Sequence, residues 1–257
     1  MGRTYTRRVR LTVLGSNGTY PTPGRPASGY LVEGGGSVVW MDAGPGTLSA
    51  LHAVADPAGI DALVLTHVHG DHCLDVFPLF NLLRYGRPRR TPLPVYSPDG
   101  VAERLTAFVG AGPGHDFFRV FDFLTVAPGD DAGVGDVELS FGAAVHPVPA
   151  LGVRADVGGA SLVYSGDTGP GGDLLDLAAG ADVLLCEATH QGPRPHDGYP
   201  YHLHAGEAGA VARDAGVYRL LVTHVIPTLD PAVSVEEAAA VFEGPVDWAA
   251  PGMEVEL

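Results

Sequence analysis

The chain has 257 residues, of which 46% are hydrophobic and 18% charged, so it can bury a full core. Fifteen basic residues against 30 acidic ones give a formal net charge of −15, which makes binding to long nucleic acids unfavourable. The most basic segment, Arg84–Arg90, is interrupted by proline and is typical of a solvated loop. Two cysteines make no disulfide framework, and no segment resembles a signal peptide or reaches membrane-spanning length. We therefore expect a cytoplasmic protein with no membrane partner.

Runs rich in valine and leucine recur along the chain and are separated by segments with helical spacing. The expected strands are Arg10–Leu14, Tyr30–Glu33, Val38–Asp42, Ala62–Thr66, Pro94–Tyr96, Val137–Ala144, Ser161–Ser165, Val183–Cys186, Arg219–Thr223 and Pro245–Ala249. The expected helices are Thr47–Ala55, Leu74–Tyr85, Val101–Val109, Gly172–Ala179, Ala205–Ala215 and Ser234–Phe242. The chain opens with strands and then alternates strand and helix, with no proline- or serine-rich linker. This order predicts one α/β domain over residues 1–257.

Polar residues that can bind metals follow five of the expected strands directly. These residues are Asp42, His67, His146, Asp167 and His224. In α/β folds, functional loops gather at the carboxyl ends of strands, so we expect these five side chains to lie together.

A dense group of candidate ligands follows the fourth expected strand. His67 and His69 are two residues apart and can chelate one cation, while Asp71 and His72 can face a second. Gly70 between the pairs gives the turn the freedom to fold back. Imidazole suits zinc, iron and manganese, and carboxylate widens the choice.

These residues resemble the signature of the metallo-β-lactamase-fold hydrolases. The motifs that carry the resemblance are Thr66–His72, Asp42–Gly44, Ser165–Thr168 and Leu221–His224, joined by Ala144–Pro149, Cys186–Thr189 and His202–Ala205, which resemble the ribonuclease Z-like branch. The length, Ala27–Tyr30 and Asp71–Asp75 are similar to compact cyclic-nucleotide phosphodiesterases of this fold, which lack the arm that binds transfer RNA. The resemblance implies a four-layer αββα sandwich, with two mixed β-sheets and helices on both outer faces.

The resemblance also implies two divalent metal ions, zinc first, with manganese or iron as alternatives. One ion would bind the three histidines His67, His69 and His146, and the other would bind Asp71, His72 and His224. Asp167 would bridge the two ions. Asp42 would lie behind the ligands and fix the tautomer of a histidine, or it would be an ordinary buried turn carboxylate.

The implied reaction is attack on phosphorus by a hydroxide held between the two metals. Asp71 or Asp167 would accept the proton of the water. His202 would protonate the leaving oxygen, and Glu187 would orient His202 or supply its proton. The alternative for His202 is a surface-loop histidine.

His204 departs from the ribonuclease Z-like pattern, which has serine or threonine at this position. It is expected to be the N-cap of the helix Ala205–Ala215, with Glu207 at capping-box spacing. Because a helix N-terminus attracts phosphate, His204 would contact substrate, or it would be a tolerated weak cap.

The substrate expected from the sequence is small. Asp167 follows His146 by 21 residues, which leaves room for a hairpin but not for an arm that binds transfer RNA. We therefore expect a small phosphodiester such as a cyclic nucleotide, with no long nucleic acid as partner. Hydrolysis of a lactone, carboxylic ester or thioester is the first alternative, since the same centre polarises carbonyl groups. Transfer-RNA 3′ processing and metal binding without catalysis rank lower, and a homodimer stays open.

Overall fold

The computed structural model describes residues 9–87, 89, 91–112, 114–195 and 200–257, which form two seven-stranded sheets. The first sheet has the order β14-β1-β2-β3-β4-β5-β6. Its strands are β1 (Arg10–Gly15), β2 (Gly29–Gly34), β3 (Ser37–Met41), β4 (Ala62–Val64), β5 (Leu93–Ser97), β6 (Phe121–Thr125) and β14 (Glu254–Glu256). The pairs from β14 to β3 are antiparallel and those from β3 to β6 are parallel, so the sheet is mixed.

The second sheet has the order β13-β12-β11-β10-β9-β8-β7. Its strands are β7 (Asp131–Val134), β8 (Val137–Ala143), β9 (Leu151–Val157), β10 (Ala160–Tyr164), β11 (Val183–Glu187), β12 (Arg219–Thr223) and β13 (Val246–Trp248). Here β10 to β13 pair in parallel and β7 to β10 pair antiparallel. The second sheet therefore repeats the arrangement of the first.

Strand residues alternate between a core shared by the two sheets and a core under helices. In β3, Val39 and Met41 belong to the shared core, whereas Trp40 packs beneath the helices of the first sheet. In β11, Leu185 faces the shared core and Leu184 packs beneath the helices of the second sheet. This alternation follows from the two-residue period of a strand, and it explains why strands covered on both faces are apolar throughout.

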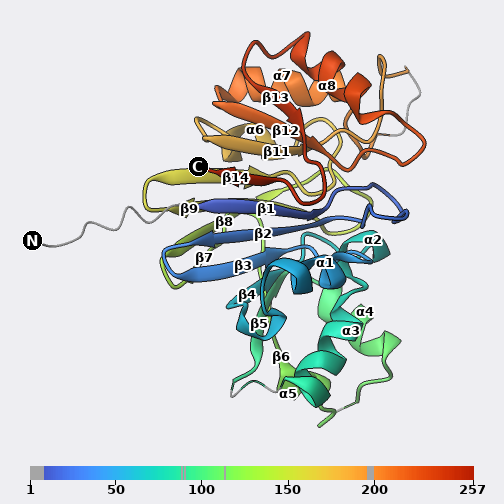
Figure 1. Ribbon diagram of the computed structural model, residues 1–257, viewed down its shortest axis with the longest axis vertical. Helices are drawn as coiled ribbons and strands as arrows, with labels where there is room; N and C mark the ends of the chain where they lie inside the picture. Colours follow the sequence, from blue (N-terminus) through green and yellow to red (C-terminus); the bar gives the residue numbers. More distant parts are fainter. Residues whose placement is uncertain (1–8, 88, 90, 113, 196–199) are drawn as a thin grey trace, which may run out of the picture.

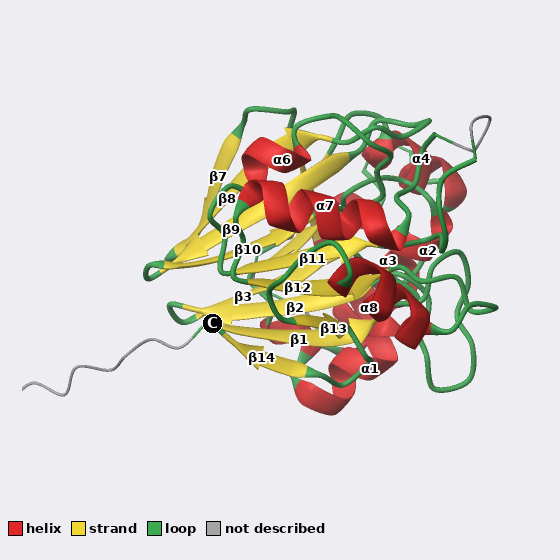
Figure 2. Ribbon diagram, turned by 90° about the horizontal axis from the view of Figure 1, so that it is seen from above, coloured by secondary structure: helices red, strands yellow, loops and turns green. Residues whose placement is uncertain are grey.

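Helices cover both outer faces of the sheet pair, on opposite sides of the strands in Figure 1. The first group comprises α1 (Thr47–Val54), the 3₁₀ turn Pro57–Gly59, α2 (Gly70–Cys73), α3 (Val76–Asn81), the π-helical turn Leu82–Gly86, α4 (Val101–Phe108) and α5 (Phe117–Val120). The second group comprises α6 (Leu174–Leu177), α7 (Ala205–Ala215) and α8 (Pro231–Ala239), which lie over the second sheet in Figure 2. The expected αββα sandwich is thus confirmed. No helix in the described part of the chain is long and apolar enough to cross a membrane.

Some element boundaries differ from the expected ones. The expected helix 74–85 starts only at Val76, because Asp75 Oδ2 accepts a hydrogen bond from Leu48 N (2.7 Å) at the start of α1. The last helix begins three residues earlier than expected, since Asp230 Oδ1 caps it at Ala232 N (3.0 Å) and Pro231 occupies its first position. The expected hairpin between His146 and Asp167 is confirmed as β9–β10.

Candidate metal centre

The carboxyl ends of strands from both sheets meet at one edge of the sandwich. Asp42 follows β3, and His67 follows β4 by three residues. His146, Asp167 and His224 follow β8, β10 and β12. The structure brings these side chains into one cluster with residues of α2, as the strand-end pattern predicts.

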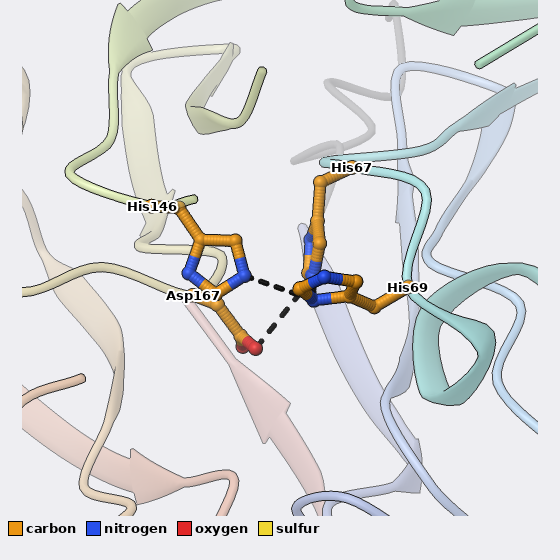
Figure 3. A group of neighbouring side chains, drawn as sticks. All are labelled: His67, His69, His146 and Asp167. Carbon is orange, nitrogen blue, oxygen red and sulfur yellow. Dashed lines mark hydrogen bonds and ion pairs between the residues drawn. The ribbon is translucent and has the colours of Figure 1, made fainter. Parts of the chain in front are cut away.

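The first ligand group consists of His67, His69, His146 and Asp167, whose donor atoms lie within 4.8 Å of one another (Figure 3). His69 Nδ1 is 3.1 Å from His67 Nε2 and 3.0 Å from His146 Nε2. Asp167 Oδ2 is 3.7 Å from His67 Nε2. Three imidazole nitrogens and one carboxylate oxygen therefore converge on one point from separate segments of the chain.

The second ligand group consists of Asp71, His72, Asp167 and His224. His224 Nε2 lies 3.2 Å from Asp71 Oδ2 and 3.4 Å from Asp167 Oδ1. His72 Nε2 lies 3.6 Å from Asp71 Oδ2. Asp167 thus turns Oδ2 toward the first group and Oδ1 toward the second, which is the placement of a bridging carboxylate.

These separations fit divalent cations. Ligand atoms about 2.0–2.1 Å from a tetrahedral zinc ion are about 3.3 Å from one another. His72 Nε2 and Asp167 Oδ1 are buried and 3.2 Å apart, yet neither has a hydrogen-bond partner among the described residues. Such orphaned polar atoms are costly unless a ligand satisfies them, so the donor set fits the implied metals.

Each histidine that presents Nε2 holds its Nδ1 against an oxygen. His67 Nδ1 lies 3.1 Å from Thr66 Oγ1, and His72 Nδ1 lies 2.7 Å from Asp42 Oδ2. His146 Nδ1 is 3.3 Å from Tyr201 O, and His224 Nδ1 is 2.8 Å from Thr189 Oγ1. Donation from Nδ1 leaves Nε2 directed into the cluster, as metal ligation requires. These tautomers are assigned from the hydrogen-bond network.

Asp42 is buried behind the ligands and joins three elements. Its Oδ1 accepts from Thr66 N (2.8 Å), and its Oδ2 accepts from Thr66 Oγ1 (2.8 Å), from His72 Nδ1 and from Tyr164 OH (2.8 Å). Asp42 adopts a positive φ of 56°, a strained conformation that these bonds hold in place. Asp42 thus contacts His72 directly, and its role in orienting that histidine stays a prediction.

Burial and nearby charges shift the histidine pKa values of the two ligand groups in opposite directions. Burial lowers the pKa of His67 and His69, and it lowers that of His146 to about 4, so these imidazoles are neutral near pH 7.

In the second ligand group, burial also opposes the charged form of His72, but Asp167, Asp42 and Asp71 outweigh it and raise the His72 pKa well above its usual value. The second group therefore holds protons that a cation would displace.

The two carboxylates of the centre are ionised. Burial alone would raise the pKa of Asp71, but His72 and His224 outweigh it and lower the pKa. Burial likewise opposes ionisation of Asp167, and again His224 and His72 hold its pKa well below the usual range. Both side chains are thus in the anionic form that binds a cation or accepts a proton.

His202 and Glu187 form a pair beside the cluster. His202 Nδ1 lies 3.0 Å from Glu187 Oε1, and its ring stacks on that of His224 with centroids 5.6 Å apart. The side chain of His202 is 15% exposed, whereas that of Glu187 is fully buried. Their donor atoms and those of His224 form a third group within 4.8 Å. The expected acid pair thus lies at the metal cluster, not on a distant surface loop.

His204 is the N-cap of α7, as expected, and Glu207 Oε2 accepts from His204 N (2.9 Å). The His204 side chain is buried, and its Nδ1 donates to Gly192 O (2.8 Å). Its ring lies 5.0 Å from that of His190. These contacts describe a side chain that ties α7 to the preceding loop, and contact with substrate stays a prediction.

The loop around Thr19 contacts the second ligand group, which the sequence did not predict. Thr19 N donates to Asp71 Oδ2 (2.9 Å), and Thr19 has a positive φ of 64°. A Cβ atom at Gly18 would lie 2.6 Å from His224 O, so only glycine allows this loop to approach the ligand. The Asn17-Gly18 turn signal marks a loop, but nothing in the sequence relates it to residues more than 50 positions away.

Comparison with known proteins places the chain in a family. Residues 23–225 match the model of the beta-lactamase superfamily domain. The chain is 42% identical over 246 residues to the uncharacterized protein Rv1339 of Mycobacterium tuberculosis, covering 93% of this chain and 88% of that protein. It is 34% identical over 245 residues to ribonuclease Z of Mycobacterium avium, covering 86% of this chain and 87% of the relative.

Solved structures agree with this placement. The metallo-β-lactamase fold protein YhfI from Bacillus subtilis superposes with a TM-score of 0.88 at 26% identity, over 98% of this chain and all of that one. The short form of human tRNase Z superposes with a TM-score of 0.77 over 96% and 98% of the two chains, and at 20% identity it supports the fold alone. The chain therefore belongs to the beta-lactamase superfamily, as a metallo-β-lactamase-fold hydrolase of the ribonuclease Z-like branch.

Proposed function

We propose that the chain is a phosphodiesterase that hydrolyses a small phosphodiester, such as a cyclic nucleotide, at a centre of two divalent ions, most favourably zinc. The observation that carries this proposal is the position of Asp167, whose two oxygens face two complete ligand groups. One zinc ion needs three or four protein ligands, whereas seven residues converge here. Two bound ions would polarise the phosphoryl oxygens and lower the pKa of water to supply the nucleophile.

The chain's own residues account for the proton transfers. Asp71 is anionic and is held by the amide of Thr19, so it is suited to accept a proton from the attacking water. Because His202 Nδ1 donates to Glu187, the exchangeable proton of His202 resides on Nε2. Glu187 orients the ring of His202 through Nδ1, and His202 then protonates the departing oxygen. The net reaction adds one water and gives a phosphomonoester and an alcohol.

Several features favour a small substrate over transfer RNA. The segment between His146 and Asp167 forms the β9–β10 hairpin within the second sheet, so it provides no projecting arm. The described arginines of Arg84–Arg90 have acceptors within the chain: Arg84 pairs with Asp116, Arg87 with Asp56, and Arg89 binds two carbonyls. Pro88 and Arg90 lie outside the described residues. The relation to ribonuclease Z supports phosphorus as the atom attacked.

The test is a substrate panel on protein reconstituted with zinc or manganese. The panel contains cyclic nucleotides, bis(p-nitrophenyl) phosphate, a lactone, a carboxylic ester, a thioester and a transfer-RNA precursor with a 3′ extension. We expect the highest kcat/KM on the phosphodiesters, and loss of that activity in Asp167→Asn, which controls for contaminating enzymes. Preference for the carbonyl substrates or for the precursor RNA would refute the proposal. Retention of the metal without turnover of any substrate would also refute the proposal.

A further inference from the structure

Thr189 lies between the metal cluster and the acid pair. It follows β11 by two residues and is 2% exposed. Its Oγ1 is 2.6 Å from Glu187 Oε2, 2.8 Å from His224 Nδ1 and 3.3 Å from His202 Nδ1. One buried hydroxyl therefore contacts a proposed metal ligand and both members of the proposed acid pair.

The single hydrogen of the Thr189 hydroxyl determines which group donates in each of these hydrogen bonds. The hydroxyl has one hydrogen to donate, and Glu187 Oε2 is an acceptor that also receives the amide hydrogen of Leu203. The hydrogen of Thr189 is therefore directed to Glu187 Oε2, and its oxygen accepts from His224 Nδ1. His224 therefore carries a hydrogen on Nδ1, and its Nε2, which lies 3.2 Å from Asp71 Oδ2 and 3.4 Å from Asp167 Oδ1, is the atom placed to bind a metal.

The same hydroxyl holds Glu187 in place for His202. Glu187 Oε2 is fixed by Thr189 Oγ1 and by Leu203 N (3.2 Å), and Oε1 accepts from Thr168 N (2.6 Å) and from His202 Nδ1. His202 Nδ1 is nearer to Glu187 than to Thr189, so it donates to the carboxylate. Loss of the Thr189 hydroxyl would leave Glu187 Oε2 with one of its two donors and allow the carboxylate to turn.

We infer that Thr189 is a positioning residue that links metal binding in the second ligand group to proton delivery by His202. Its hydroxyl sets the tautomer of His224 and the orientation of Glu187. The inference rests on the proposed function, because it assigns the linked groups to a metal and to a general acid. Thr189 itself is neither a proposed metal ligand nor a member of the proposed acid pair.

Four variants test the inference. Thr189→Val keeps the shape and removes the hydroxyl. Thr189→Ser and Thr189→Ala both lack the methyl group and differ only in the hydroxyl. The control Thr106→Val makes the same isosteric change in α4, where Thr106 Oγ1 donates to the carbonyls of Ala102 and Glu103, away from the cluster.

The first measurement is a zinc titration of metal-free protein by calorimetry, repeated with cobalt to follow its visible absorption. We expect Thr189→Val and Thr189→Ala to weaken binding of one of the two ions by roughly 10- to 100-fold, the usual effect of losing a partner of a ligand histidine. The other ion should keep its affinity. Thr189→Ser and Thr106→Val should bind both ions as the wild type does.

The second measurement is kcat at saturating metal. The valine and alanine variants should lose more activity on an alkyl phosphodiester than on an aryl one, and serine should restore both. Equal metal affinity in the alanine and serine variants, or equal weakening of both ions, overturns the inference. If the valine variant does not fold, the alanine–serine comparison decides alone. A wild type that binds fewer than two ions refutes the proposed function instead, so the two failures are distinguishable.

Discussion

His67 and His72 are both fully buried and their rings lie 4.2 Å apart, yet their surroundings shift their pKa values in opposite directions. Asp167 raises the pKa of His67, but burial and the neighbouring histidines outweigh it. His72 contacts Asp42 and lies near Asp71 and Asp167. Residue type alone therefore does not set the charge of the centre, which depends on how carboxylates are distributed around each ring.

His202 provides the prediction that separates metal chemistry from proton delivery. His202→Ala should leave two ions bound and slow hydrolysis of an alkyl or nucleoside phosphodiester by roughly 10²–10⁴-fold, the usual range for losing a general acid. The loss on bis(p-nitrophenyl) phosphate should be much smaller, because p-nitrophenolate leaves without protonation. Steady-state kinetics on both substrates, with metal analysis of the same samples, measures this.

Glu187→Gln serves as the companion variant, since it keeps the shape of the side chain and replaces the carboxylate that His202 Nδ1 contacts. It should show the same dependence on leaving group in milder form. Equal losses on both substrates in His202→Ala would mean that His202 acts in substrate binding or metal positioning rather than as an acid.

The ligand residues could be found from the sequence because six residues after β4 contain four of the seven. The hydroxyl groups that hydrogen-bond to these ligands or to Asp42 could not be found from the sequence. Tyr164 OH reaches Asp42 from 122 residues away, and Thr189 reaches His224 from 35 residues away. Tyr164 lies in an apolar strand and Thr189 at the end of the Cys186–Thr189 motif, and in neither case does the surrounding sequence show which groups the hydroxyl contacts.

At the level of elements, the segment before α7 determines where His202 lies. Its described parts, 191–195 and 200–203, are fastened at several points. Gln191 Nε2 donates to Asp230 O (2.7 Å), and Gly192 N donates to the Glu237 carboxylate (2.9 Å). Arg194 binds Glu207 Oε2 (2.6 Å) and the His202 carbonyl (2.5 Å). These contacts place His202 against the loop that follows β10.

Gly169, in the loop after β10, lies close to the backbone of the chain just before His202. A Cβ atom there would lie 1.6 Å from Pro200 O and 3.3 Å from Tyr201 Cα, so Gly169→Ala must displace the chain just before His202. We expect kcat on an alkyl phosphodiester to fall by about 10²-fold, as expected for a displacement of about 1 Å at a catalytic group. Two bound ions should be retained, because no ligand side chain is altered.

The matched control is Gly206→Ala in the first turn of α7, where the nearest atom to a new Cβ is 4.0 Å away. Alanine is the better helix former, so this variant should keep full activity and equal or exceed the wild-type melting temperature. Full activity in Gly169→Ala would show that the position of His202 does not depend on this contact.

The sequence predicted the central strands better than the edges. Strands such as β4, β11 and β12 are apolar throughout because they are covered on both faces. The edge strands β6, β7 and β14 were missed, since about half of their residues are exposed and their patterns are weak. The inner strand β9 was expected only as part of a hairpin after His146 and not as a strand with its own bounds. The π-helical turn Leu82–Gly86 also has no recognised sequence signal, so the helix that contains α3 was predicted to be too long.

At the scale of the whole molecule, two sheets of similar construction share one functional edge. In each sheet an antiparallel part leads into a parallel part, and ligands follow β4 in the first sheet and β8, β10 and β12 in the second. Asp167 from the second sheet faces His67 from the first (Figure 3). The centre therefore depends on the packing of the sheets, while a single domain over residues 1–257 stays a prediction.

The most direct test of the dinuclear centre is the number of ions per chain. The chain is purified without chelator, reconstituted with zinc, separated from free metal and analysed by elemental analysis against protein concentration. Seven converging ligands predict two ions per chain in the wild type. Asp167→Ala should lose affinity for both ions together, because its two oxygens face both ligand groups. One ion or none in the reconstituted wild type, or loss of a single ion in Asp167→Ala, would contradict the account.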